Sequence, residues 1–262
     1  MKLVMAVMGL LLALRAGAAP LLDLPQYPQI DQHALERYAY LTIEKREAQA
    51  RAAGELGCVR YCEMLERAYT RVTRAAREQG EAAHAIGWRL VVTTTRGEAA
   101  MSLPGGYVVI SEDLIASLRL TEAEVAFIIA HEVAHVLLQH EAECLDYLQA
   151  TLLPHGVRRT VRDLYAEMDY DAGALLRMES VMQSGEMEAD YAGLLLGAQA
   201  GYAPAQMLGA LKKIDAGGKQ RAGIVRTHPA MLQRLQRLER LLPTAERVLT
   251  VAGGTRKIKN LQ

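Results

Sequence analysis

The stretch "IIAHEVAHVLLQH", residues 128–140, carries two histidines four residues apart, with a glutamate directly after the first. On an α-helix, residues at this spacing lie on one face, so the imidazoles of His131 and His135 can bind one metal ion. Glu132 lies beside that face, where it can act as general base on a water molecule held by the metal. This pattern is typical of zinc metallohydrolases. The alternative is an apolar core helix that carries two histidines.

A third candidate ligand follows in "SGEMEADYAG", residues 184–193. Catalytic zinc needs three protein ligands and one open position, and we expect Glu186 to complete the set. Asp190, one turn later, can accept a hydrogen bond from the second ring nitrogen of a ligand histidine and so fix the orientation of that ring. The sequence therefore predicts one zinc ion per chain, bound by His131, His135 and Glu186.

The remaining histidines differ in their setting. His228, in "RTHPAMLQRL", follows a glycine-containing loop from which it can reach the metal. It can stabilise the oxyanion of a tetrahedral intermediate or occupy the open metal position, and capping a helix is the alternative. We take it, with Glu132, as a candidate catalytic residue. His140 is turned away from the ligand face and is expected to be structural. The others are interpreted as surface or packing residues: His33, His84 and His155.

The hydrophobic periodicity favours an α+β fold that is mainly α. The β-branched segments "WRLVVTTT" (88–95) and "GGYVVIS" (105–111) predict two strands of a small β-sheet. Thr121 and Glu124 match a capping box, which begins the helix that carries the histidine pair. Helical patterns predict further helices over residues 31–54, 55–80 and 184–201, one ending near 213, and a last one from 229.

Composition limits the class of protein. The chain has 262 residues, with 30 basic and 30 acidic side chains, and 51% of its residues are hydrophobic. Because there is no basic excess and no basic stripe interleaved with aromatic residues, we expect no nucleic-acid partner. We expect a single domain over residues 31–250, a proline-rich linker over 19–30 before it and a C-terminal tail over 251–262.

The N-terminus has the layout of a targeting segment. Lys2 precedes an apolar run over residues 3–14, and small residues follow at 16–18. The run is too short to cross a bilayer of roughly 30 Å as a helix, and this order is typical of a secretory signal. We interpret residues 1–18 as a signal peptide or N-terminal anchor. The expected location is exported and periplasmic, with membrane association if the N-terminus is not cleaved.

The three cysteines leave two alternatives open. Cys58 and Cys62 lie one turn apart on the helix predicted over 55–80, a geometry that makes a mutual disulfide unfavourable. One of them can pair with Cys144 and leave the other free, or all three can be small buried thiols.

Several motifs occur together in order: "LPGGYVVIS", "LTEAEVAFIIA", "HEVAH", "EMEAD" and "THPAMLQRL". Between about residues 88 and 242 they resemble the zinc metallopeptidase family M48, which includes bacterial quality-control proteases and the CAAX prenyl proteases. Two departures occur. Ala134 stands where many members have glycine, and "AAMSLPGG" stands where many read "NAFALPGG", which puts Ala99 and Met101 at the Asn and Phe positions.

The resemblance implies a gluzincin-type metallopeptidase domain with a small β-sheet beside the zinc-binding helix, and places the "GGYVVIS" strand near the edge that pairs with extended substrate. It also implies roles for six residues: zinc ligation by His131, His135 and Glu186, general acid–base catalysis by Glu132, support by Asp190, and regulation or transition-state support by His228.

The expected function is that of a zinc-dependent endopeptidase. Its substrates are expected to be unfolded or misassembled cell-envelope proteins, with a metal-held water, activated by Glu132, as the nucleophile. The alternative is a latched or non-catalytic zinc protein with a chaperone or binding role in the envelope, in which His228 caps the metal. Turnover after substitution of Glu132 distinguishes the two.

Overall fold

The computed structural model describes residues 21–22, 30–152, 158–216 and 231–259 of the chain. The described elements follow in the order α1 (Gln32–Ala52), α2 (Cys62–Arg77), α3 (Glu81–Ala85), β1 (Arg89–Thr93), β2 (Met101–Leu103), β3 (Tyr107–Ser111), α4 (Glu112–Leu118), α5 (Glu122–Leu137), α6 (His140–Leu152), α7 (Val161–Tyr170), α8 (Ala172–Gln199), α9 (Pro204–Met207), α10 (Gly209–Ala216) and α11 (Met231–Lys259). The predicted fold class, α+β and mainly α, is confirmed.

The sheet has the strand order β1-β3-β2. β1 runs parallel to β3, and β2 runs antiparallel to it, with Ser102 opposite Val108. Gly106, in the turn between β2 and β3, has a φ of 97°, and a Cβ added there would lie 2.6 Å from Cγ2 of Ile86. Only glycine fits this conformation and this close approach. The two predicted strands are confirmed, while β2 is an addition that the sequence did not predict.

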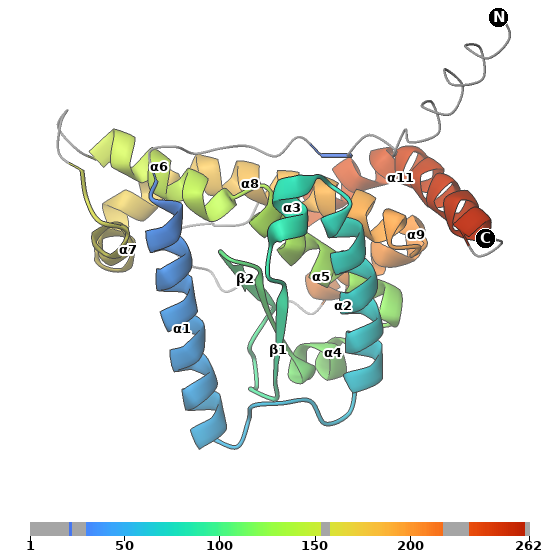
Figure 1. The fold of residues 1–262 in the computed structure, drawn as a ribbon, viewed down its shortest axis with the longest axis horizontal. Coiled ribbons are helices and arrows are strands. Elements are labelled where there is room, and N and C mark those ends of the chain that lie inside the picture. Colours follow the sequence, from blue (N-terminus) through green and yellow to red (C-terminus); the bar gives the residue numbers. More distant parts are fainter. Residues whose placement is uncertain (1–20, 23–29, 153–157, 217–230, 260–262) are drawn as a thin grey trace, which may run out of the picture.

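Helices cover both faces of the sheet (Figure 1). On one face, Val91 and Val109 pack with Ile43 of α1. On the other face, Val108 and Ile110 belong to the main hydrophobic core, which also contains the buried faces of α2 and α5. Because side chains alternate along β3, one face of this strand packs against α1 and the other packs into the main core. Strand β3 therefore connects α1 to the rest of the molecule.

Helices α5 and α8 form the centre of the main core. Thr121 and Glu124 form the predicted capping box at the start of α5: the Thr121 hydroxyl accepts from the backbone N–H of Glu124, whose carboxylate accepts from the N–H of Thr121. Helix α8 begins at Ala172, well before the predicted start near Ser184, and runs alongside α5 as one continuous helix. The part of α8 that follows Glu186 is thus brought against α5 at Ala130 and His131.

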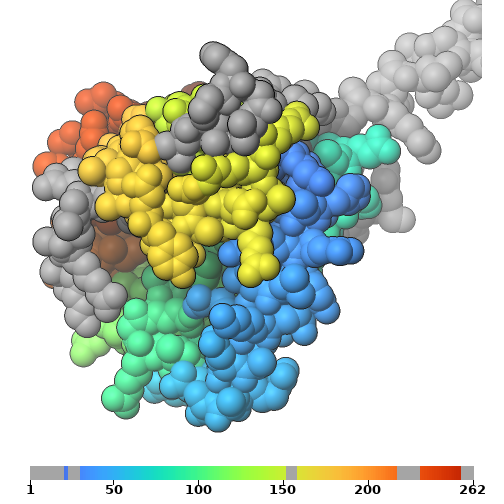
Figure 2. Space-filling view, turned by 90° about the vertical axis from the view of Figure 1, so that its left-hand side faces the viewer, coloured from blue at the N-terminus to red at the C-terminus, as the bar shows by residue number. Residues whose placement is uncertain are grey.

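Helices α6 and α7 lie in the segment of the chain that connects α5 to α8. They pack with α1 in a second hydrophobic cluster, in which Leu35 meets Leu145 and Leu164. The rings of Tyr38 and Tyr165 stack there with centroids 4.1 Å apart. Figure 2 shows this side of the molecule, where α1 (blue) lies against the yellow region of the chain. This cluster closes one side of the space in front of the histidines.

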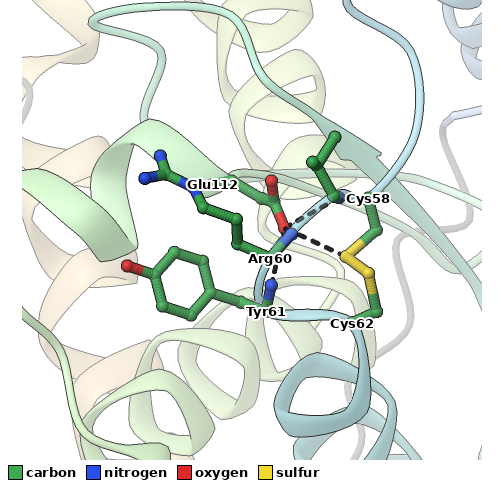
Figure 3. Close-up of a disulfide and its surroundings, with 6 residues drawn as sticks. Cys58, Arg60, Tyr61, Cys62 and Glu112 are labelled. Carbon is green, nitrogen blue, oxygen red and sulfur yellow. Dashed lines mark hydrogen bonds between the residues drawn. A yellow bond between two sulfur atoms is a disulfide. The ribbon is translucent and has the colours of Figure 1, made fainter.

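The expectation for the cysteines is wrong. Helix α2 begins at Cys62 and not near residue 55, because the segment before it pairs with β1: the N–H of Gly57 donates to the carbonyl of Val92 over 2.8 Å. Cys58 therefore lies in a loop and not on a helix. In that position it forms a disulfide with Cys62, their Cα atoms being 5.5 Å apart (Figure 3). Cys144 is free.

Some predictions lie outside the described residues. These are the signal or anchor over 1–18, most of the linker over 19–30, and the histidines His155 and His228. The domain limits at 31 and 250 stay a prediction, and α11 continues beyond 250 as far as Lys259. Among the helices that are described, none has the length and apolar character needed to span a membrane.

Candidate metal centre

Three side chains on two helices converge in the centre of the molecule. The Nε2 atoms of His131 and His135, both on α5, are 3.1 Å apart. Glu186, on α8, places Oε2 3.6 Å from Nε2 of His131 and Oε1 3.4 Å from Nε2 of His135. All three ligand atoms lie within 4.8 Å of one another. The structure thus brings together the three residues that the sequence singled out.

Close packing of α5 and α8 produces this convergence. A Cβ added at Gly193 of α8 would lie 2.9 Å from the backbone nitrogen of His131 and 3.0 Å from its Cα. A glycine at this point allows the two backbones to approach each other more closely than any side chain would permit. Glu186 lies two turns earlier on the same helix, so it faces the histidines of α5 directly.

Asp190 connects the site to α11. Its Oδ1 lies 3.1 Å from Nδ1 of His131, and both of its oxygens accept hydrogen bonds of 2.7 Å from Arg234. Burial would raise the pKa of Asp190, but the hydrogen bonds with Arg234 and His131 outweigh burial and lower it. An ionised carboxylate only accepts, so it favours a proton on Nδ1 of His131 and leaves Nε2 free to bind a metal ion.

The electrostatics of the site suit a cation. Burial would lower the pKa of His131, but hydrogen bonds and charge interactions with Asp190 and Glu186 raise it to about 10. A site that holds a proton this firmly has an excess of negative charge, and a divalent metal ion can neutralise that charge in place of the proton. Two imidazole nitrogens and one carboxylate are also a donor set that zinc accepts.

His140 was expected to be a structural residue turned away from the ligand face, but it lies beside His135. Helix α5 ends at Leu137, and the chain turns through Gln139, whose φ is 54°, so α6 begins at His140 in a new direction. Nδ1 of His140 lies 2.9 Å from Nδ1 of His135. Burial and the neighbouring histidines lower the pKa of His140 to about 3, so it is neutral beside His135.

Glu132 faces a cavity of about 740 Å³ that also exposes His131, His135 and Glu186. Its Oε2 accepts a hydrogen bond of 2.9 Å from Oγ of Ser102 on β2. A carboxylate, a candidate metal centre and a strand edge therefore line one space. That combination can hydrolyse a bond in an extended chain, with the carboxylate moving the proton.

Three residues of this centre were not predicted from the sequence as part of it: Ser102, His140 and Arg234. For Arg234 a signal existed. In the last helix the buried positions Met231, Leu235 and Leu238 define one apolar face, and Arg234 lies on that face. A charged residue on an apolar face requires a buried partner, so its position alone pointed to a carboxylate in the core.

Comparison with known families agrees with this geometry. Residues 64–242 match the model of Peptidase family M48. The chain belongs to peptidase family M48. Its M48 domain contains both helices of the candidate metal centre, together with β2 and the first part of α11. The domain is therefore that of a metallopeptidase, which is a hydrolase.

The M48 domain is similar to several curated proteins named mitochondrial metalloendopeptidase OMA1. The protein of Saccharomyces cerevisiae is 30% identical over 172 residues, which cover 62% of this chain and 49% of the yeast protein. That of Schizosaccharomyces pombe is 30% identical over 167 residues, covering 62% and 48%. That of Arabidopsis thaliana is 33% identical over 148 residues, covering 55% and 30%. The chain spans about half the length of these relatives, or less.

These relatives correct the expected location. The layout of the N-terminus predicted an exported, periplasmic protein, whereas the curated relatives are mitochondrial. The prediction failed because a short apolar run after a basic residue shows a general membrane-targeting character and does not name the membrane.

Proposed function

We propose that this protein is a zinc-dependent endopeptidase that cleaves peptide bonds of protein substrates. One zinc ion per chain would be held by His131, His135 and Glu186. The observation that supports this most strongly is that the ligand atoms of these residues converge beside Glu132 in one cavity. A purely structural metal site has no use for a carboxylate next to the open position.

A zinc ion held by His131, His135 and Glu186 would supply a Lewis acid for the scissile carbonyl and would lower the pKa of a water molecule. Glu132 takes the proton of the attacking water and passes it to the nitrogen of the leaving amine. Asp190 holds His131 in the orientation that presents Nε2, and Arg234 keeps Asp190 ionised. A role of His228 in supporting the oxyanion is part of the proposal and concerns a residue outside the described ranges.

The substrate is proposed to bind as an added strand. We expected the strand at "GGYVVIS" to lie near the pairing edge, but β3 is the central strand and pairs on both sides. Strand β2 is an edge strand, and its residues Met101–Leu103 line the cavity with Glu132. Addition of an extended segment to this edge favours unfolded or misassembled proteins as substrates. The further expectation of cell-envelope proteins depended on the periplasmic location and is not carried forward.

The test compares the parent protein with Glu132→Gln, which keeps the size of the side chain and removes its basicity. Zinc is measured per chain after purification without chelators, and turnover is measured with casein. We expect one zinc in both proteins and cleavage only by the parent. Glu66→Gln is the matched control, since Glu66 is an exposed carboxylate on α2, and it should cleave as the parent does.

Each other outcome has a definite meaning. One zinc in the parent without cleavage would favour the latched or non-catalytic zinc protein. No zinc in the parent would refute the metal centre itself. Equal cleavage by the parent and Glu132→Gln would show that Glu132 takes no part in the reaction.

A further inference from the structure

Ser102 is joined to Glu132 across the gap between β2 and α5. Its hydroxyl donates to Oε2 of the carboxylate over 2.9 Å, although the two residues are 30 positions apart in the chain. Among the described residues, this is the one side-chain hydrogen bond that Glu132 makes. A hydrogen bond to an ionised carboxylate is among the stronger ones in proteins.

The neighbours of Ser102 fix the strand that carries it. Met101 and Leu103 pack on the opposite face of β2, against the cluster that contains Ile43 and Val109. β2 is also paired with β3 in a defined register. Because side chains alternate along a strand, burial of these two neighbours directs Ser102 towards α5. The hydroxyl is thus held by the sheet and does not depend on the flexible side chain of Glu132.

We propose that Ser102 is a positioning residue that holds one oxygen of Glu132 and leaves the other to accept the proton of the attacking water. This inference rests on the proposed function. A glutamate side chain on a helix surface has several rotamers, and proton transfer requires a distance of about 2.6–3.2 Å. Fixing Oε2 from a rigid strand removes most of the unproductive arrangements.

The same residue belongs to the edge to which a substrate strand would be added. It lies on the strand that would pair with the peptide, while its side chain bonds Glu132. Docking of a peptide on β2 therefore acts on the strand that sets the position of Glu132. The alignment of the substrate and the alignment of Glu132 therefore both depend on Ser102, which couples them.

The first test is kinetic and uses Ser102→Ala and Ser102→Thr. We expect Ser102→Ala to lower kcat by between about 10-fold and 100-fold, with KM and zinc content unchanged. Ser102→Thr keeps a hydroxyl on a residue that strands favour, so it should restore most of the rate. Leu103→Ala is the comparison, because it keeps the hydroxyl but loosens β2, and it should raise KM while lowering kcat by less than Ser102→Ala does.

The second test does not depend on turnover. The unfolding equilibrium constants of metal-free parent, Ser102→Ala, Glu132→Ala and the double variant form a double-mutant cycle. We expect Ser102→Ala to raise the unfolding constant by about 3-fold to 10-fold in the parent and by much less when Glu132 is already alanine.

Additive effects in the cycle would overturn the contact and with it the proposal. A coupled cycle with an unchanged kcat for Ser102→Ala would overturn the positioning role alone. A parent that binds zinc but cleaves nothing would refute the proposed function, and the positioning role would fall with it even if the cycle shows coupling.

Discussion

Asp190 is the residue through which α11 acts on the metal centre. It is 2% exposed and accepts two hydrogen bonds from Arg234, itself 7% exposed, while it faces Nδ1 of His131. Removing its charge would leave the guanidinium of Arg234 buried without its main partner and would release the ring of His131. Loss of this charge would therefore lower both the affinity for the metal and the stability of the folded protein.

We predict that Asp190→Asn weakens zinc binding by about 10-fold to 100-fold. Competition with a chelating dye measures the affinity. Glu179→Gln is a matched control on the same helix, because Glu179 bonds Gln183 and lies away from the ligands. An equal loss in both variants would mean that charge in general, and not the contact with His131, sets the affinity.

Glu112 gives a second prediction at this scale. One oxygen accepts from the backbone N–H groups of Val59, Arg60 and Tyr61 over 3.1, 2.7 and 2.8 Å (Figure 3). Burial would raise the pKa of Glu112, but these backbone hydrogen bonds lower it overall. Because the folded pKa is depressed, the ionised carboxylate stabilises the protein above the unfolded value of about 4.3, and this contribution is lost as the pH falls through the folded pKa.

The stability difference between the parent and Glu112→Gln should therefore shrink as the pH is lowered from 6 to 3. Urea midpoints at several pH values measure it. A difference that stays constant over this range would show that the carboxylate charge contributes nothing to the loop.

The residues of the centre differ in how far the sequence could predict them. The spacing of His131 and His135 is set by the helix period, so their shared face follows from the sequence alone. Glu186 could be proposed only because the motif "EMEAD" accompanied the first one. The partners Ser102 and Arg234 depend on how separate segments pack, 30 and 44 positions from the residues they bind. The position of Arg234 on an apolar helix face indicates a buried partner, but no local pattern says which residue that partner is.

At the scale of elements, helices α5 and α8 together supply the residues of the candidate metal centre. At Gly193 the backbone of α8 lies close against the backbone of His131 on α5. A methyl group there has no flexible side chain to displace, so the helices must separate. Separation would also move Glu186 away from the histidines.

We predict that Gly193→Ala lowers the free energy of unfolding by about 1–3 kcal/mol and weakens zinc binding as well. Gly253→Ala on α11 is the control, because nothing lies within 4 Å of its added Cβ. Replacing a glycine inside a helix should be neutral or slightly stabilising there. Chemical denaturation measures both variants, and equal stability of Gly193→Ala and the parent would contradict the close packing.

The elements that the sequence missed are short or compete with tertiary contacts. β2 has three residues without a β-branched side chain, so neither length nor composition marks it. The segment before Cys62 has helical composition, but its backbone groups pair with β1 instead, as in the bond from Thr94 N–H to the Glu55 carbonyl. In the segment before Cys62, tertiary pairing overrode a local preference.

At the scale of the whole molecule, a metal ion would join parts that the chain supplies separately. Its ligands come from α5 and α8, and Arg234 brings in α11 through Asp190. A ligand that binds only the folded state stabilises it by about 2.7 kcal/mol when its free concentration is 100 times Kd. The metal centre should therefore affect global unfolding.

We predict that chelation lowers the Tm of the parent and that added zinc restores it. His135→Ala should show little dependence on either, since it lacks one ligand. Differential scanning calorimetry with and without chelator measures the effect. An unchanged Tm on going from one zinc per chain to none would show that the metal does not bridge the helices.

The fold class could be predicted for the whole chain because periodicities of 3.6 and 2 residues are strong over long segments. The cellular location could not be predicted from the sequence. It depended on one apolar run near the N-terminus, and the mitochondrial relatives contradict it.

The length of β2 limits what the protein can discriminate. Three residues at about 3.3 Å each give an edge of roughly 10 Å. A peptide segment without proline at the paired positions can form main-chain bonds over that distance, and those bonds are nearly the same for all the other amino acids. With so short an edge, the protein would distinguish a chain that can be extended from one that cannot, and the identity of the residues on either side of the cut would contribute little.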